Sequence, residues 1–424
     1  SGEAWAILAR MPLPRHLAFA FAFAVTLVAG VCACQSPERS LAAVSAATES
    51  GPSTSQTGPP SAVPAPLPTA GASPSQATSQ ATPSAAPTAT PVSIGSQPIT
   101  LSFAGDVHFE RHLRALVDRP DSLAELRPVL GSADVTVVNL ESAITSRGTP
   151  EPKEFHFRTT PAALSVLADA GVDVVSLANN HAVDFGPDGL ADTLAAKAAS
   201  PVPVIGIGQR AAEAFAPAVV TVRGTSIAVI ASTQVNDLTV NKYPATDRSA
   251  GVAGNLRNDR LVAEVTAARR RYDVVVVFLH WGTEQQRCPD AAQLATASAL
   301  EKAGADVIVG GHAHRVQGAG WLGRAYVGYG LGNFVWWLNS QTPGDVTSGV
   351  LTVSVDPAAA RARAEQRAGA SAPPSGPIVT SATWTPLTIS AVDGIPRPPA
   401  PSARPAAGAA WNDARTCTNL RSNP

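Results

Sequence analysis

The sequence is poor in aromatic residues, charged residues and methionine. Of its 424 residues, 5% are aromatic and 15% are charged, and the formal net charge is −1. Nucleic-acid-binding proteins usually carry a basic patch or stripe, so this balance argues against a nucleic-acid partner. The single methionine, Met11, is the expected natural start of translation, which places Ser1–Arg10 upstream of the natural chain.

Residues 1–34 combine these upstream residues with a predicted lipoprotein-type signal peptide. A weakly positive start is followed by the apolar run Leu17–Val31, which is too short to span a bilayer comfortably. The next residues, Val31–Cys34, resemble a bacterial lipobox, in which the cysteine at the cleavage site is lipidated. We therefore expect an exported protein that is anchored to the cell envelope through a lipid at Cys34. An uncleaved N-terminal membrane anchor is the alternative.

Beyond the signal, the composition predicts one folded region. Residues 35–96 contain mainly Ser, Thr, Ala, Pro, Gln and Gly, and such a segment cannot bury enough apolar surface to offset its ordering entropy, so we expect a disordered linker. Residues 97–395 form the expected domain, with a low-complexity insert at about 358–376, and residues 396–424 form a C-terminal tail. Cys288 and Cys417 are the two cysteines left, and export makes them a candidate disulfide.

Within the domain, apolar strands alternate with helices. The predicted strands are Ile99–Ala104, Ala133–Val138, Val172–Leu177, Val202–Ile207, Ser226–Ser232, Asp273–Leu279, Ala305–Val309, Ala325–Tyr329, Val350–Val355 and Ala382–Ile389. The predicted helices are Pro161–Ala170, Pro187–Ala198, Leu256–Arg271 and Asp290–Ala303. Continuous apolar strands between helices indicate an α/β protein whose sheets are covered on both faces.

Five of these strands end in residues that bind metals. The candidate ligands are Asp106, His108, Glu141, Asn180, His181, His280, His312 and His314. In an α/β sheet, ligands bind at the carboxyl ends of the strands, so these side chains are expected to converge. His312 and His314 follow a strand and Gly310-Gly311, and in extended chain their imidazoles would point to the same side. This donor set favours zinc, manganese or iron.

The inventory is large enough for two divalent transition-metal ions that share a carboxylate and lower the pKa of a bridging water. His181 would then remain for general acid work or oxyanion binding, with Asp184 as its catalytic partner. Glu284 and Asn333 lie close enough in sequence to orient ligands. Each residue alone also has a structural interpretation, such as a turn cap or a satisfied core histidine, so the prediction rests on the set.

Seven segments together resemble the CapA family, the bacterial poly-γ-glutamate capsule biosynthesis proteins, which are similar to calcineurin-like metallophosphoesterases. The segments are LSFAGDVH, VNLESAIT, FHFRTTP, VSLANNHAVDFGPDGL, VFLHWGTE, ADVIVGGHAHRVQG and YGLGNFVW, and the resemblance covers about Ile99–Val355. It implies a four-layered αββα sandwich of the metallo-dependent phosphatase type, with the metal site at one end of the two sheets.

The family pattern is carried over residue by residue. Asp106 and His108 match its Asp-x-His, Asn180-His181 its Asn-His pair, His280 its lone histidine, and His312 with His314 its Gly-His-x-His. The Gly-Asp-x-x-Asp motif of the phosphoesterases is absent, and Asn139-Leu140-Glu141 stands in its place, so Glu141 is the candidate bridging ligand. The Gly-Asn-His motif is Asn-Asn-His here. These departures weaken the expectation of ordinary phosphomonoesterase activity and leave that of metal binding intact.

Three functions are compatible with these residues. The first is an exported CapA-like protein that helps to make, export or attach poly-γ-glutamate or another anionic polymer through a metal-dependent hydrolytic or transfer step. The second is an envelope metallophosphoesterase or amide hydrolase acting on a phosphate or γ-glutamyl substrate. The third is a non-catalytic, metal-stabilised scaffold that holds polymer or membrane synthase partners. No synthase-like nucleotide loop is present, so polymerisation itself would belong to a partner.

Overall fold

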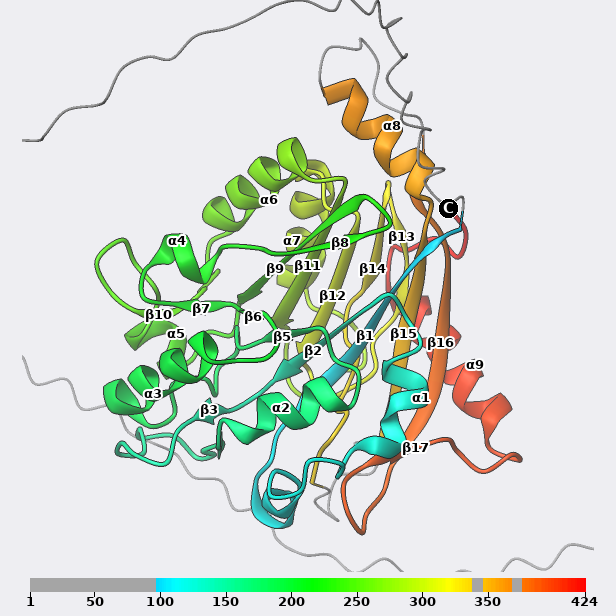
Figure 1. The fold of residues 1–424 in the computed structure, drawn as a ribbon. Coiled ribbons are helices and arrows are strands. Elements are labelled where there is room, and N and C mark those ends of the chain that lie inside the picture. The colour runs from blue at the N-terminus through cyan, green and yellow to red at the C-terminus, as the bar shows by residue number, and fades with distance from the viewer. Residues whose placement is uncertain (1–96, 338–345, 368–375) are drawn as a thin grey trace, which may run out of the picture. The chain divides into compact units, whose positions relative to one another are not determined.

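Two β-sheets lie face to face at the centre of the fold, and helices cover their outer faces (Figure 1). The computed structural model describes residues 97–337, 346–367 and 376–424. The predicted signal peptide, with its lipobox at Cys34, and the predicted linker 35–96 lie outside these residues. In the described part of the chain, no helix is both long and apolar enough to cross a membrane.

The first sheet has seven strands, and its site-bearing half is parallel. In spatial order the strands are β17 (Pro396–Arg397), β16 (Val379–Ile389), β15 (Thr347–Val355), β1 (Ile99–Val107), β2 (Val135–Leu140), β5 (Val174–Ser176) and β6 (Val204–Ile205). Strands β1, β2, β5 and β6 pair in parallel, whereas β15, β16 and β17 extend the sheet in antiparallel pairs. The carboxyl ends of the parallel strands therefore meet at one edge.

The second sheet has six strands and the same feature. Its order is β13 (Ala319–Leu322), β14 (Ala325–Gly328), β12 (Val307–His312), β11 (Val274–Trp281), β9 (Thr225–Thr233) and β8 (Ala218–Val222). Strands β9, β11, β12 and β14 are parallel neighbours, and β8 and β13 close the two edges in antiparallel pairs. Short strands elsewhere form two further pairs, β3 (Ala143–Ile144) with β4 (Arg158–Thr159), and β7 (Ile207–Gly208) with β10 (Gly251–Val252).

The two-residue period of the strands divides their side chains between two apolar layers. In β11, Val274, Val276 and Phe278 pack between the sheets, whereas Val275 and Val277 pack outward. The outward side meets α6 (Asp259–Arg271) and α7 (Ala291–Ala303). On the other sheet, the outward side packs against α2 (Ala162–Asp169) and α3 (Gly186–Ala198). The four-layered αββα sandwich implied by the family resemblance is therefore the observed arrangement, and the continuous apolar runs follow from burial on both faces.

The other helices of the described residues lie around these layers or at the ends of strands. They are the 3₁₀ helices η1 (Arg111–Leu116), η2 (Ala124–Leu126) and η3 (Arg415–Cys417), and the α-helices α1 (Arg127–Leu130), α4 (Ala211–Ala214), α5 (Leu238–Lys242), α8 (Pro357–Arg367) and α9 (Arg404–Ala414).

Two segments differ from the sequence-based description. The insert predicted as low-complexity at 358–376 begins as the helix α8, because its Ala- and Arg-rich composition favours helix and the Asp356 carboxylate accepts hydrogen bonds from the backbone N–H groups of Ala358 and Ala359. The segment described as a C-terminal tail contains α9, whose Trp411 is buried against the inter-sheet core. The structure joins Cys288 to Cys417 by a disulfide.

The N-terminus of helix α7 is stabilised by side-chain hydrogen bonds whose contribution to folding can be measured. Asp290 accepts a hydrogen bond from Gln293 N–H, and the Gln293 side chain accepts one from Asp290 N–H, so the two form a capping box. We expect Asp290→Ala to lower the free energy of unfolding by about 1 kcal/mol, because the first turn loses its acceptor. Denaturant unfolding measures this, with Asp290→Asn as the control that retains a capping oxygen. A loss in the Asn variant equal to that in Ala would contradict the capping role.

Candidate metal centre

The carboxyl ends of four parallel strands, two from each sheet, bring the predicted ligands together. Asp106 lies near the end of β1, Glu141 follows β2, His280 lies in β11, and His312 ends β12. Three groups of side chains have ligand atoms within 4.8 Å of one another: Glu141 with His280 and His312, Asp106 with Glu141 and His314, and Glu284 with His312 and His314. Glu141, His312 and His314 each belong to two groups, so the three groups form one cluster.

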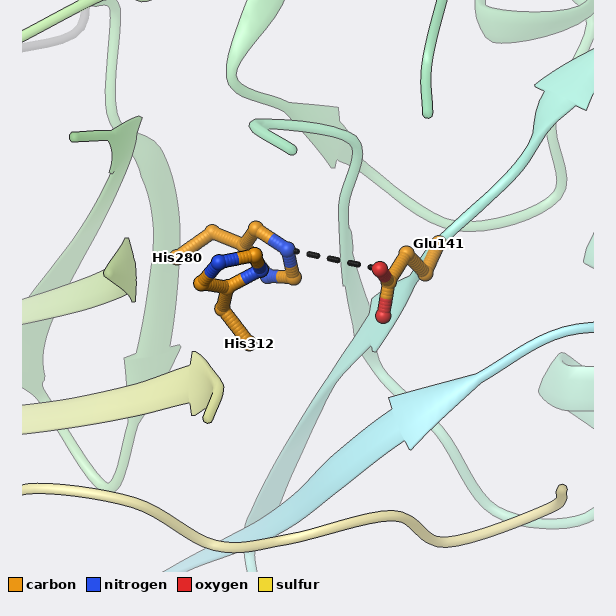
Figure 2. Close-up of side chains that lie close together, drawn as sticks. All are labelled: Glu141, His280 and His312. Carbon is orange, nitrogen blue, oxygen red and sulfur yellow. Dashed lines mark ion pairs between the residues drawn. The ribbon is translucent and has the colours of Figure 1, made fainter. Parts of the chain in front are cut away.

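Glu141 lies at the centre of this cluster. Its Oε1 is 3.5 Å from His280 Nε2 (Figure 2). The same oxygen is 3.7 Å from His181 Nε2. The same His280 Nε2 is 2.8 Å from Asn180 Oδ1. A carboxylate oxygen, an amide oxygen and an imidazole nitrogen thus converge on one point, and these are donor types that divalent transition metals accept.

Asp106 connects the two sheets. Its Oδ2 accepts a hydrogen bond of 2.7 Å from His312 N–H, and its Oδ1 accepts one of 2.8 Å from Asn139 Nδ2. Asn139 is the register partner of Asp106 in the neighbouring strand and also lies 3.2 Å from His280 Nδ1. Asn139 was not among the predicted site residues, because an asparagine at a strand end carries no motif of its own.

The expectation of an extended chain at His312 and His314 is wrong. Their φ angles are 82° and 51°, so both residues adopt left-handed backbone conformations and their ring centroids are 5.9 Å apart. L-residues rarely adopt this conformation because Cβ approaches the following carbonyl. The turn delivers one imidazole beside His280 and the other beside Asp106, rather than both to the same face of a strand.

Gly311 makes room for this arrangement. A Cβ at this position would lie 2.2 Å from Asp106 Oδ1. We therefore expect Gly311→Ala to displace the carboxylate, to cost about 1–3 kcal/mol of folding free energy through overpacking and to weaken metal binding about 10- to 100-fold. Calorimetric metal titration and thermal unfolding measure these effects. Gly408→Ala is the control, since no atom lies within 4 Å of its Cβ position, and wild-type behaviour of Gly311→Ala would refute the steric argument.

Buried atoms without hydrogen-bond partners test whether a cation fits. Both carboxylate oxygens of Glu141, Nδ1 of His312 and Nε2 of His108 are buried and lack such partners. Leaving a polar atom in this state costs about 1–3 kcal/mol, and more for a charged group. A divalent cation within the cluster would satisfy the Glu141 oxygens, so the donor set and its unmet bonding capacity fit a metal.

Burial in the cluster favours the metal-binding form of two histidines and disfavours the charged form of the two carboxylates. Burial lowers the pKa of His280 to about 4 and holds the pKa of His312 well below its usual value, so both imidazoles are neutral at neutral pH. Burial raises the pKa values of Asp106 and Glu141 because their negative charges are desolvated. Burial opposes protonation of His314 too, but the carboxylates of Glu141, Asp106 and Glu284 outweigh it and raise the pKa of His314. A cation would offset the desolvation of both carboxylates.

The predicted catalytic pair lies at the edge of the cluster. His181 Nδ1 is 2.6 Å from Asp184 Oδ2, which also accepts a hydrogen bond of 2.7 Å from Phe157 N–H. Lys153 Nζ is 2.8 Å from Asp184 Oδ1 and donates to Asn180 O at 2.7 Å. Lys153 therefore contacts both the predicted catalytic residue Asp184 and the predicted ligand Asn180. Sequence reasoning missed it, since its segment follows no strand and carries no metal-ligand spacing.

Like Asn180 and His181, the predicted ligand His108 belongs to none of the three groups found among the described residues. Its ring stacks on Phe157 with centroids 4.7 Å apart and meets Trp336 edge-on at 4.1 Å. Phe157 also stacks on His181 at 4.1 Å, so it lies in contact with both histidines. Asn333, predicted to orient a ligand, has its Oδ1 2.7 Å from His314 Nδ1.

The central part of the chain is similar to known proteins. Residues 100–336 match the family model described as bacterial capsule synthesis protein PGA_cap. The PGA biosynthesis protein CapA of Bacillus subtilis (strain 168) is 30% identical over 243 residues, which are 56% of this chain and 63% of that protein. The capsule biosynthesis protein CapA of Bacillus anthracis is 28% identical over 251 residues, 57% of this chain and 60% of that protein. The chain thus spans less than two thirds of the length of these curated relatives.

A solved structure described as a novel phosphatase from Mycoplasma pneumoniae is also similar in backbone. Its TM-score is 0.42 at 14% sequence identity, and the match covers 69% of this chain and 95% of that chain.

Proposed function

Since the chain belongs to the bacterial capsule synthesis protein PGA_cap family, we propose that it takes part in the biosynthesis of poly-γ-glutamate or another anionic envelope polymer. The two Bacillus relatives are named for the biosynthesis of PGA and of a capsule. The proposed contribution of this chain is a metal-dependent hydrolytic or transfer step on the polymer. Export and a lipid anchor at Cys34 are part of the same proposal, and they are motivated by the signal-like segment before the linker.

The buried Glu141 carboxylate is the observation that carries the catalytic part. It lies among histidine side chains, and neither of its oxygens is hydrogen-bonded. The proposed ligands of a pair of Mn, Fe or Zn ions are Asp106, Glu141, Asn180, His280, His312 and His314. Asn180 is included because its Oδ1 lies 2.8 Å from His280 Nε2, whereas the predicted ligand His108 lies apart from the three groups. A bound divalent cation supplies Lewis-acid polarisation of a carbonyl or phosphoryl oxygen and lowers the pKa of a bound water.

His181 is the proposed acid–base residue. Asp184 Oδ2 accepts the hydrogen bond from His181 Nδ1–H, which leaves Nε2 on the side of Glu141 as the atom that exchanges a proton with substrate. Asp184 itself is held by Lys153 Nζ and by Phe157 N–H. These two contacts orient the carboxylate, so the imidazole ring is positioned before substrate arrives.

The proposal is tested by incubating the metal-loaded protein with γ-linked glutamate chains of defined length and following chain length by mass spectrometry. Shortening or transfer that requires Mn²⁺, Fe²⁺ or Zn²⁺ and is lost in His181→Gln would support the catalytic function. His112→Gln is a matched control, because His112 is exposed and belongs to none of the three groups. Failure to bind or to convert these chains at full metal occupancy would overturn the proposal.

One observation also favours a second candidate, the non-catalytic scaffold. Asn139 and Glu141 stand where the phosphoesterase pattern has its Gly-Asp-x-x-Asp motif, and the Asn139 side chain is engaged by Asp106 and His280. In the same assay, the scaffold would bind metal and polymer without changing chain length, and its polymer affinity would survive His181→Gln. Turnover of phosphoesters alone would instead identify an envelope phosphoesterase.

A further inference from the structure

A pocket of about 370 Å³ lies beside the candidate metal centre, and the proposed catalytic step makes no use of it. The side chains that matter here are Gln285, Arg287, Arg315, Thr347, Trp384 and Trp411. Three of them, Thr347, Trp384 and Trp411, lie beyond the residues that match the family model. The C-terminal part of the chain therefore supplies one wall of the pocket.

Two backbone segments carry residues of both the pocket and the metal centre. Arg315 directly follows His314, and Gln285 directly follows Glu284, and both histidine and glutamate belong to one of the ligand groups. The backbone N–H of Gln285 donates a hydrogen bond of 2.8 Å to Ala313 O, which holds the two segments together. The pocket and the metal centre are therefore neighbouring parts of the molecule.

The charge of the pocket points to an anionic ligand. Two arginines line the pocket, of which Arg287 is exposed and Arg315 is half-buried. A guanidinium group presents planar, paired donors that match a carboxylate, and it stays charged at any physiological pH. Two such groups on adjoining segments fit two acidic groups spaced along one ligand.

Another part of the pocket lining is apolar. Trp384 of β16 and Trp411 of α9 stack with ring centroids 4.1 Å apart and an interplanar angle of 1°. Val316, Ala407 and Ala410 line the same pocket. Flat indole and small aliphatic side chains provide a contact surface for methylene groups.

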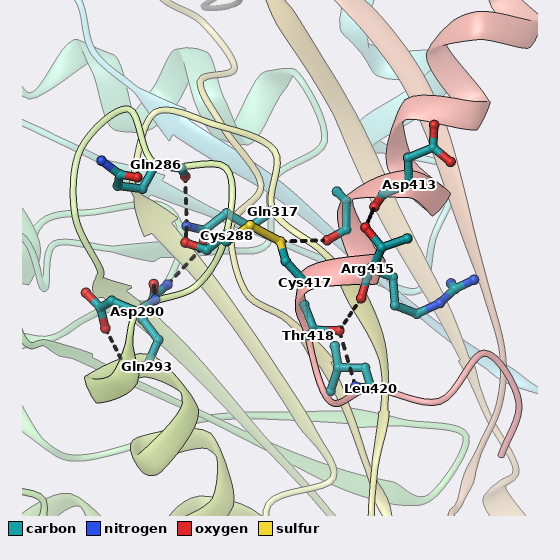
Figure 3. The surroundings of a disulfide bond; sticks show 12 residues. Gln286, Cys288, Asp290, Gln293, Gln317, Asp413, Arg415, Cys417, Thr418 and Leu420 are labelled. Carbon is teal, nitrogen blue, oxygen red and sulfur yellow. Dashed lines mark hydrogen bonds between the residues drawn. A yellow bond between two sulfur atoms is a disulfide. The ribbon is translucent and has the colours of Figure 1, made fainter.

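The loop that carries Arg287 is fixed from two sides (Figure 3). Gln317 Nε2 donates hydrogen bonds to Gln286 O at 3.0 Å and to Cys288 O at 3.3 Å. The disulfide between Cys288 and Cys417 fastens this loop to the segment that follows α9. A site held in this way loses little conformational freedom on binding, which favours affinity.

We propose that this pocket binds a segment of a γ-linked glutamate chain next to the unit that occupies the metal centre. Such a chain carries one carboxylate and two methylene groups per unit, joined by amide bonds, which matches a pocket lined by arginine and indole side chains. The inference rests on the proposed function, because the polymer class comes from there, and it adds a second subsite that fixes the direction and the acidic character of the substrate.

The test is equilibrium binding of an oligo-γ-glutamate to the full chain loaded with Mn²⁺, measured by calorimetry and by tryptophan fluorescence. Arg287→Gln and Arg315→Gln are each expected to weaken binding about tenfold, the effect of losing a charge-assisted hydrogen bond. Arg270→Gln is the matched control, because Arg270 is an exposed arginine of α6, in the outer helical layer, and is not among the residues that line the pocket. Metal content must be equal in all four proteins.

Wild-type affinity in both arginine variants would overturn the pocket while leaving the proposed function in place. Loss of binding only in a variant that has also lost its metal would overturn the pocket in the same way. Failure of the wild type to bind any oligo-γ-glutamate would instead defeat the proposed function, and the pocket inference with it. Preference for polyphosphate over oligo-γ-glutamate, with the same dependence on both arginines, would overturn the carboxylate assignment.

Discussion

Purified His312→Ala/His314→Ala protein is expected to retain less than about a tenth of the metal held by the wild type, in which about two equivalents of a transition metal are expected. The two imidazoles take part in all three ligand groups, so their loss leaves no group complete. Removing even a residue that supports a ligand costs about 10- to 100-fold in metal affinity, and direct ligands cost more. Metal analysis of protein purified without chelators, followed by titration with Mn²⁺, Fe²⁺ and Zn²⁺, measures the effect.

His112→Ala is the control for this experiment, since His112 is exposed in η1 and outside every ligand group. Thermal unfolding gives a second measurement, because a metal that binds only the native state stabilises it by about 2.7 kcal/mol at a hundred times its Kd. Added metal should therefore raise the Tm of the wild type and the control, but not that of the double variant. Metal content below a tenth of an equivalent in the wild type itself would refute the metal centre.

Loss of the disulfide is expected to have the largest effect on stability. Cys288 and Cys417 are 129 residues apart, and a cross-link that closes a loop of this length destabilises the unfolded chain by about 5 kcal/mol in the loop-entropy description. We expect Cys288→Ser/Cys417→Ser to lower the free energy of unfolding by about 2–5 kcal/mol. Helix α9 and the residues after it should also exchange their amide protons faster, since Trp411 and Leu420 would remain their main apolar anchors.

Denaturant unfolding in the presence and absence of a reductant separates the bond from the substitutions. Reduced wild type should unfold at the same denaturant concentration as the double-serine variant, and the variant should not respond to reductant. An unchanged midpoint in both would show that the C-terminal segment contributes no global stability. We also expect the double-serine variant to bind oligo-γ-glutamate more weakly while its metal content stays unchanged. The reason is that the disulfide no longer connects the loop that carries Arg287 to the segment after α9.

Much of the architecture could be predicted from local patterns. The order of strands and helices, the α/β class and the end of α7 at Gly304, whose φ is 105°, all follow from apolar periodicity, caps and turn residues. The observed boundaries of helices and strands differ from the predicted ones by a few residues. Helix α6, for example, begins at Asp259, whereas the predicted helix began at Leu256. The layered arrangement followed from family resemblance, and the alternate packing of strand residues accounts for it.

The geometry of the candidate metal centre was harder to predict from the sequence than the order of strands and helices. The sequence placed candidate ligands at strand ends, and the structure brings Asp106, Glu141, His280, His312 and His314 together, whereas their role as metal ligands stays a prediction. Sequence reasoning omitted Asn139 and Lys153, whose contacts reach across strands and loops. It also assumed extended backbone at His312 and His314, because a left-handed turn at two non-glycine residues has no local signature.

The sequence by itself determined which segments form strands and which polar residues follow them, since burial on two faces and capping are properties of neighbouring residues. Only the tertiary structure decided that His108 stacks on Phe157 outside the ligand groups, that Lys153 holds Asp184, and that Trp384 and Trp411 meet beside the arginines. These contacts join segments far apart in the chain. The distances between these side chains depend on how the layers pack against one another, because that packing determines which side chains from distant segments come into contact.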